Sequence, residues 1–210
     1  AIGLLIAFVF GMLNFTPITI LPSMLQQLQG YPDSIIGLIL SARGVGTLIG
    51  FFCMAFAGRL DPRIALSVGF IFQVIAGYSM WGFNINVTIF DVVWTTGLQG
   101  LGVGLMWVPL SVIAFSTLSP KFVPDGTAIF HLLRNIGSSV HISISIALIL
   151  RTTKVNYVQI TEFVTPYNKG FNIPSISGAW NVEGSSGLIA IGNEVMRQAM
   201  MIGYLNSFAF

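Results

Sequence analysis

The chain has 210 residues, of which 54% are hydrophobic and only 8% are charged, and its formal net charge is +2. Soluble domains contain about 25% charged residues, so this composition excludes a water-soluble globular protein and predicts a membrane protein. The small net charge and the lack of any Lys/Arg run exclude nucleic acid as a partner.

Five apolar stretches are long enough to cross a bilayer, which takes about 20 residues in a helix. Lipid offers the backbone no hydrogen-bond partner, and the stretches lack the alternating polar positions of barrel strands, so we expect helices. Short turns join them, which predicts antiparallel neighbours in an all-α, polytopic transmembrane helix bundle. The predicted spans are Ile2–Met24, Ile35–Ala57, Ile64–Trp81, Val92–Phe115 and Gly126–Leu150, and a sixth, truncated one runs from Met196 to Phe210.

The positions of Lys and Arg predict the orientation of the bundle. The second and fourth turns carry Arg59, Arg63 and Lys121, whereas the first and third turns carry no cation, which places the former in the cytoplasm. The segment 151–195 is then an external, periplasmic loop. Its own cations count for less because the charge rule weakens as loops lengthen.

Two parts of this external segment have helical periodicity. Tyr157, Ile160 and Val164 recur on one face, which predicts that the fifth helix continues as an amphipathic helix up to Pro166. A second amphipathic piece leads into the last span, with Leu188, Ile191 and Val195 on one side. The residues between these pieces are rich in Gly, Pro, Ser and Asn and predict a loop.

Arg134 is the first of two arginines inside predicted spans. It lies nine residues after Asp125, a predicted helix cap, which is about 13 Å along the helix axis. A guanidinium at mid-bilayer costs about 3 kcal/mol, so we expect it to face the bundle interior or a wet cavity and to find an acceptor. His131 lies one turn earlier on the same side. Arg134 either pairs with backbone carbonyls near the helix end or lines a substrate or proton path.

Arg43 is the second such arginine, about eight residues into the second span. Its own helix interior offers no carboxylate, so its partner comes from another helix, from the backbone or from water. Asp33 and Asp91 are the only acids in the short turns near that face. Both a structural and a functional role are consistent with this position.

Small residues and prolines indicate where helices approach and where they bend. Pro109 removes one backbone hydrogen bond in the fourth span, which predicts a helix kink beside Trp107. Such a kink is suited to a moving transporter helix or to an apolar drug pocket. Asn14, with Thr16 and Pro17, is expected to play a matching part in the first span. Tight helix crossings are predicted at Gly44, Gly46, Gly50, Gly97, Gly100, Gly104 and Gly137.

The sequence does not support an enzyme. The G-x-S-G pattern at 184–187 falls in a predicted aqueous loop, and no His follows its serine to act as a base. His141 and Ser145 share a helix face, but a hydrogen-bonded buried histidine explains them. The single cysteine, Cys53, has no second thiol or nearby His, so we expect no disulfide, no metal site and no cofactor.

Three stretches resemble one transporter family. The segments "LPSMLQQLQGYPDSIIGLILSARGVGTLIGFFCMAFAGRLDPR", "LQGLGVGLMWVPLSVIAFSTLSP" and "GTAIFHLLRNIGSSVHISIS" are similar to the C-terminal portion of EmrB/QacA-type drug:proton antiporters of the major facilitator superfamily. "ITEFVTPYNKGF" resembles an external loop of the EmrB branch. The resemblance implies the C-terminal half of a major facilitator fold, with the last helix truncated and the N-terminal half missing.

The resemblance also implies roles for individual residues. Arg59, Asp61 and Arg63 match a shortened form of a cytoplasmic turn that latches one conformation. Arg134 matches an arginine of the penultimate helix, and the stretch from Gln99 to Pro109 matches the Gly-rich helix before it. The implied substrate-path residues are Arg134, His131, Arg43, Gln99, Trp107 and Asn14.

The expected function is proton-driven efflux of apolar or amphipathic drugs across the bacterial cytoplasmic (inner) membrane by alternating access. The proton gradient is the energy source, although no Asp or Glu lies deep in a predicted span. The EmrB branch implies a periplasmic adaptor and an outer-membrane channel as partners. Two alternatives stay open, namely a same-superfamily exporter of a siderophore or metabolite, and a non-transporting membrane scaffold or sensor.

Overall fold

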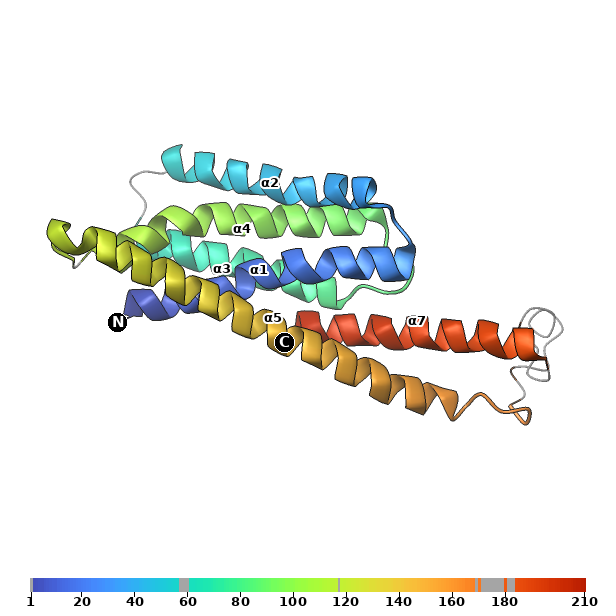
Figure 1. Cartoon of the computed structure of the whole chain (residues 1–210). Coiled ribbons are helices and arrows are strands. Elements are labelled where there is room, and N and C mark those ends of the chain that lie inside the picture. Colours follow the sequence, from blue (N-terminus) through green and yellow to red (C-terminus); the bar gives the residue numbers. More distant parts are fainter. Residues whose placement is uncertain (1, 57–60, 117, 169, 171–179, 181–183) are drawn as a thin grey trace.

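Six α-helices make up most of the described part of the chain (Figure 1). The computed structural model describes residues 2–56, 61–116, 118–168, 170, 180 and 184–210, and these contain no β-strand. The all-α bundle predicted from the sequence is therefore confirmed. The helices are α1 (Ile2–Gln29), α2 (Asp33–Phe56), α3 (Pro62–Trp81), α4 (Ile89–Phe115), α5 (Val123–Thr161) and α7 (Ser185–Ala209), and a short 3-10 helix covers Pro120–Phe122.

Local signals decide where several helices begin and end. Thr88 and Asp91 form a capping box at the start of α4, in which each side chain accepts a hydrogen bond from the backbone N–H of the other residue. Asp61 caps α3 by accepting from the backbone N–H of Arg63 at 3.0 Å. Gly30, with a φ of 66°, ends α1 in the left-handed conformation that glycine adopts without strain.

Neighbouring helices run antiparallel, as predicted (Figure 1). The turns 30–32 and 82–88 lie at one end of the bundle, and Lys121 lies in the turn at the opposite end. The closest packed pairs are α2 with α4, α1 with α5, α3 with α4, and α5 with α7. In Figure 1, α5 and α7 continue past the end that carries the turns 30–32 and 82–88. Which end faces the cytoplasm stays a prediction.

Glycines bring α2 and α4 into backbone contact. A Cβ atom on Gly46 would overlap the carbonyl oxygen of Gly97, and one on Gly100 would overlap the carbonyl oxygen of Arg43. Gly50 similarly lies against Gly104. Such close approach is how membrane helices gain packing contacts. The prediction of a tight crossing is wrong for Gly44, since nothing lies within 4 Å of a Cβ placed there.

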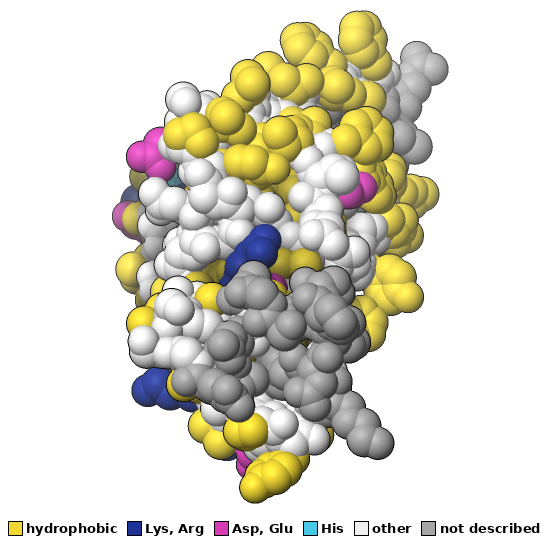
Figure 2. Space-filling view, turned by 90° about the vertical axis from the view of Figure 1, so that its right-hand side faces the viewer, with side chains coloured by type: hydrophobic (Ala, Val, Ile, Leu, Met, Phe, Trp, Pro, Cys, Tyr) yellow, Lys and Arg dark blue, Asp and Glu magenta, His cyan; other side chains and the backbone are white. Residues whose placement is uncertain are grey.

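Five described helices, α1 to α5, are long and apolar enough to cross a membrane. Large hydrophobic side chains point outward from them, with Leu38 73% exposed and Phe56 91% exposed. Figure 2 shows the end of the bundle that carries the turns 30–32 and 82–88, with hydrophobic side chains gathered mainly at the upper and right-hand rim and other side chains and backbone in the middle. This distribution fits a bundle whose sides face lipid and whose ends face water.

The core has two apolar layers with a polar layer between them. One layer includes Leu21, Leu25 and Ile39, and the other includes Phe10 and Met106. Each of the first four helices carries at least one buried polar side chain between or beside these layers. These side chains are Asn14 and Thr16 on α1, Arg43 on α2, Gln73 on α3, and Thr95, Thr96 and Gln99 on α4.

The segment 151–195 is not a loop throughout. Residues 151–161 continue α5 as predicted, although the helix ends at Thr161 and not at Pro166. Residues 185–195 belong to α7, because the second amphipathic piece and the last span join into one helix. Ile191 and Val195 are buried as expected, but Leu188 is exposed. Asp125 lies in the first turn of α5 and is not its cap.

Candidate functional site

Arg43 is the centre of a buried polar network that joins four helices. Its side chain is only 7% exposed. One guanidinium nitrogen donates to the backbone carbonyl oxygen of Asn14 at 2.6 Å and to the Asn14 side-chain oxygen, and the other donates to Oε1 of Gln99. Gln73 Nε2 in turn donates to the backbone carbonyl oxygen of Gln99 at 2.9 Å. We call these four residues the Arg43 network.

Neutral acceptors alone surround the Arg43 cation in the described part of the chain. The only ion pair there joins Arg197 to Glu194. The prediction that the partner of Arg43 comes from another helix or from the backbone is confirmed, and neither of the two acids near that face, Asp33 and Asp91, contacts it. The Asp91 carboxylate is held by Thr88 at the start of α4, and Asp33 accepts from Gln26. A buried cation without a counter-ion is expensive, and such residues in membrane proteins are functional candidates by default.

The Arg43 network borders a cavity of about 490 Å³. Two of its members, Gln73 and Gln99, line this space, which we call the glutamine cavity. Its volume lies in the range of about 300–1,000 Å³ that is usual for small-molecule pockets. Apolar and aromatic side chains form most of its remaining surface. The other lining residues are Leu13, Thr16, Pro17, Val74, Gly77, Tyr78, Met80, Trp81, His141, Ser207, Phe208, Ala209 and Phe210.

A second buried polar contact lies in the wall of the glutamine cavity. Thr16 Oγ1 and His141 Nδ1 are 2.6 Å apart, and the Thr16 hydroxyl also donates to the Met12 carbonyl at 2.8 Å. Since the Thr16 hydroxyl proton is donated to Met12, Thr16 Oγ1 can only accept from His141. We therefore assign the His141 tautomer that carries its proton on Nδ1. The prediction of a hydrogen-bonded buried His141 is thus confirmed. Its neighbour Ser145 is fully buried without a hydrogen-bond partner among the described residues.

Arg134 contacts aromatic rings and not an acceptor. Its guanidinium carbon is 5.1 Å from the ring centre of Trp107 and 5.6 Å from that of Phe15. These are cation–π distances. The expectation of a hydrogen-bond acceptor is wrong for the described residues, since Arg134 Nε is buried without a partner. His131 is exposed and lines a cavity of about 90 Å³ together with Trp107.

The six predicted substrate-path residues therefore form two clusters. Asn14, Arg43 and Gln99 meet in the Arg43 network, and Arg134 and Trp107 meet on the α5 side of α4. His131 is one turn from Arg134. Sequence reasoning missed Gln73, although it is the single amide in the apolar run 64–81, which is a signal that could have found it.

The predicted latch and kink residues have simpler surroundings. Arg59 lies outside the described residues. Asp61 acts as the cap of α3. Its carboxylate accepts from the backbone N–H of Arg63, while the Arg63 side chain is exposed. Pro109 is fully buried, and α4 continues through it. A latch at this turn and a kink at Pro109 stay predictions.

Comparison with known proteins finds drug exporters. Multidrug export protein EmrB of Haemophilus influenzae is 29% identical over 155 residues, which is 72% of this chain and 30% of that protein. EmrB of Escherichia coli is 27% identical over 80% of this chain and 33% of its own length. Fatty acid resistance protein FarB of Neisseria gonorrhoeae is 25% identical over 89% of this chain and 37% of FarB. No family model matches the sequence, and no solved structure does.

The matched part thus amounts to only 30–37% of the length of these relatives. The match nevertheless covers most of this chain, and these relatives are named for export or for resistance. The comparison confirms the resemblance predicted from the sequence, so this chain is similar to part of an EmrB/QacA-type drug exporter.

Proposed function

We propose that this chain is part of a membrane exporter of apolar or amphipathic drugs. The observation that carries the proposal is the contact between the Arg43 network and the glutamine cavity. Arg43 holds the Gln99 side chain, and the Gln99 backbone carbonyl holds the Gln73 amide, at the wall of a largely apolar space next to Tyr78 and Trp81. Aromatic walls with a few fixed polar groups suit ligands that combine an apolar body with one or two hydrogen-bonding groups.

Alternating access is part of the same proposal. The glutamine cavity is formed by α1, α3, α4, α5 and α7 of this chain, and the wall that closes it would come from the remainder of the full-length protein. Rocking of the two parts against each other would expose the cavity first to one side of the membrane and then to the other. The glycine contacts between α2 and α4 would let this part move as a unit.

The proposed energy source is the proton gradient. The described acidic residues Asp33, Asp61, Asp91, Asp125 and Glu162 lie at or near helix ends, and Glu194 is paired with Arg197. We therefore assign the proton-carrying carboxylates to parts of the full-length protein outside this chain. The proposed location is the inner membrane of a bacterium, with a periplasmic adaptor and an outer-membrane channel as partners.

Dye export by the full-length protein tests this proposal. Inverted membrane vesicles are loaded with a fluorescent lipophilic cation, and transport is followed with and without a protonophore. Transport that stops when the proton gradient is collapsed supports the proposal. Gradient-independent transport contradicts the energy source, and absence of any flux favours a scaffold or sensor.

The matched variants are Arg43→Met and Arg151→Gln. Both remove one arginine, but Arg43 is buried in the network whereas Arg151 is exposed on α5. We expect the Arg43 variant to lose about 90% or more of the export rate, since the lost charge-assisted contacts amount to about 1.5–3 kcal/mol. The Arg151 variant should transport normally. Equal export by both variants would remove Arg43 from the substrate path.

A further inference from the structure

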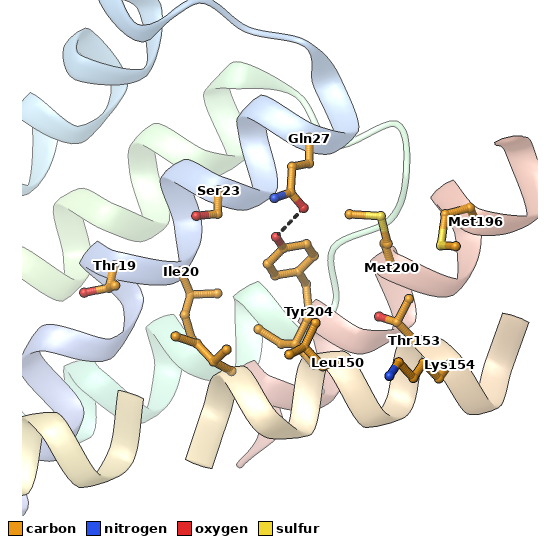
Figure 3. A pocket seen from close by; sticks show the side chains of 12 residues that line it. Thr19, Ile20, Ser23, Gln27, Leu150, Thr153, Lys154, Met196, Met200 and Tyr204 are labelled. Carbon is orange, nitrogen blue, oxygen red and sulfur yellow. Dashed lines mark hydrogen bonds between the residues drawn. The ribbon is translucent and has the colours of Figure 1, made fainter. Parts of the chain in front are cut away.

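A second cavity lies between α1, α5 and α7, away from the Arg43 network (Figure 3). Its volume is about 440 Å³. On each of the three helices the lining residues span nine positions, from Thr19 to Gln27, from Ile146 to Lys154, and from Met196 to Tyr204. The eight steps between the first and the last position extend about 12 Å along an α-helix, so the cavity is elongated along the helix axes. We call it the acyl cavity.

The walls of the acyl cavity are mostly apolar. Ile149 and Leu150 of α5 and Met196 and Met200 of α7 line it. Methionine side chains adapt to ligands of varied shape, because they are unbranched and polarisable. Tyr204 is buried, and its hydroxyl donates to Oε1 of Gln27 at 3.0 Å, so the polar group that reaches across the cavity is satisfied within the protein (Figure 3).

Two polar groups at one end of the acyl cavity lack partners within the described residues. Thr153 Oγ1 is buried without a hydrogen bond. Lys154 is next to it, is exposed, and forms no ion pair with any described carboxylate. The nearest acid on α7 is already used, since Glu194 binds Arg197 and Gln198. Figure 3 shows Thr153 and Lys154 side by side, at the end of the cavity where Met196 lies.

This end of the acyl cavity lies near the end of the bundle. Arg197, one residue after Met196, donates to the backbone carbonyl of Leu28 at 3.2 Å, and α1 ends at Gln29. Lys154 therefore lies level with the end of α1, where we expect the membrane surface, while Ile146 and Thr19 lie deeper. A largely apolar groove with a cation at one end is complementary to a molecule with one chain and an anionic head.

We propose that the acyl cavity binds a single-chain amphiphile with an anionic head group, of the chemical class of a free fatty acid. The chain would lie along Ile149, Leu150 and Met200, and the carboxylate would bind Lys154. Three helices line an elongated space of about 440 Å³, which suits one chain better than the two chains of a lipid. The proposal is independent of the transport cycle, because binding here requires neither the Arg43 network nor a proton gradient.

Photo-crosslinking of the full-length protein in lipid nanodiscs tests the proposal. The probe is palmitate that carries a diazirine near the end of its chain, and the labelled peptides are identified by mass spectrometry. We expect labels on α5 and α7 near Ile149 and Met200. Hexadecanol with the same diazirine should label these peptides about fivefold less, since it lacks the charge that pairs with Lys154. Equal labelling by the alcohol would overturn the assigned head group.

Matched variants separate the site from the general surface. Lys154→Gln should lower palmitate labelling about fivefold, whereas Lys154→Arg and Lys121→Gln should leave it unchanged, since Lys121 lies in the turn at the other end of the bundle. Both glutamine variants remove one exposed lysine, so neither should disturb folding. Labels spread over all helices and insensitive to Lys154→Gln would overturn the site.

Competition identifies the occupant. Unlabelled palmitate should remove the labels, and an excess of phosphatidylglycerol in the nanodisc should not. Stronger competition by phosphatidylglycerol would overturn the single-chain assignment. Dye export by the same variants is measured in inverted membrane vesicles. Loss of labelling with normal export refutes the acyl cavity alone, and normal labelling without export refutes only the proposed function.

Discussion

Asn14 and Phe15 are consecutive residues of α1 that contact two different cations on two different helices. Asn14 accepts hydrogen bonds from Arg43 of α2, and the ring of Phe15 lies 5.6 Å from the guanidinium carbon of Arg134 of α5. Consecutive side chains of an α-helix point about 100° apart, which is why one short stretch of α1 can serve both clusters. α1 is thereby the element that connects the buried Arg43 with the half-buried Arg134.

The two contacts should be energetically independent. Asn14→Leu removes one acceptor from a buried cation and should lower the free energy of unfolding by about 2 kcal/mol. Phe15→Leu removes one of the two rings over Arg134 and should cost about 1 kcal/mol. Because the residues share no partner, the double variant should equal the sum within about 0.5 kcal/mol. Denaturant unfolding of the full-length protein in detergent measures these values, and a coupling above about 1 kcal/mol would show that the clusters act as one.

The sequence was sufficient to predict the helices and most of the polar residues of the Arg43 network, but not which of these residues contact each other. Arg43, Asn14 and Gln99 stand out because each interrupts an apolar run, and the structure brings the three together. Neither Asp33 nor Asp91, the two acids available near that face, contacts Arg43, because both carboxylates accept hydrogen bonds close to the helix ends. Asp91 forms a capping box with Thr88, and the sequence Thr-Ile-Phe-Asp at 88–91 already has the two residues at the spacing of such a box.

Arg134 shows why pairing across helices cannot be derived from one sequence. Its neighbours Phe15 and Trp107 come from α1 and α4, and their approach depends on how α5 crosses α1. A glycine contact sets that crossing, since a Cβ on Gly11 would overlap the backbone carbonyl of Arg134. The glycine was visible in the sequence, but the residue opposite it was not.

Glycine contacts give a prediction with an internal control. Gly100→Ala places a methyl group against the backbone carbonyl of Arg43, whereas Gly44→Ala on the neighbouring helix meets nothing within 4 Å. We expect Gly100→Ala to lower the free energy of unfolding by about 1–3 kcal/mol, because α2 and α4 must move apart. Gly44→Ala should leave it unchanged or raise it slightly, since alanine favours a helix. Thermal unfolding of both variants checks this. An equal loss of stability in the two variants would mean that α2 and α4 do not cross as closely as described.

The threading of the chain is tested by labelling from one side. Asp33 lies at the start of α2 and Lys121 in the turn before α5, at opposite ends of the bundle. Asp33→Cys and Lys121→Cys, each in a Cys53→Ala background, should react with a membrane-impermeant maleimide from opposite sides of sealed vesicles. Right-side-out cells should label the Asp33 variant if that end is external, as the charge rule predicts. Reaction of both variants from one side would contradict the helix order.

The missing counter-ion of Arg43 leads to a prediction about Gln99. Gln99→Glu keeps the size of the side chain and adds a negative charge beside the cation, so the cost of burying the carboxylate is offset by attraction to Arg43. Gln99→Leu also keeps the size roughly but removes the acceptor and leaves the guanidinium less satisfied. We expect the glutamate variant to unfold within about 1 kcal/mol of the parent protein and the leucine variant to lose about 2–3 kcal/mol. Thermal unfolding of the full-length protein should therefore show the leucine variant to be less stable than the glutamate variant.

Export is expected to fall in both Gln99 variants, because the Gln99 amide that lines the glutamine cavity is lost in each. A leucine variant as stable as the glutamate variant would show that Arg43 does not depend on Gln99, and normal export by both would separate the network from the substrate path.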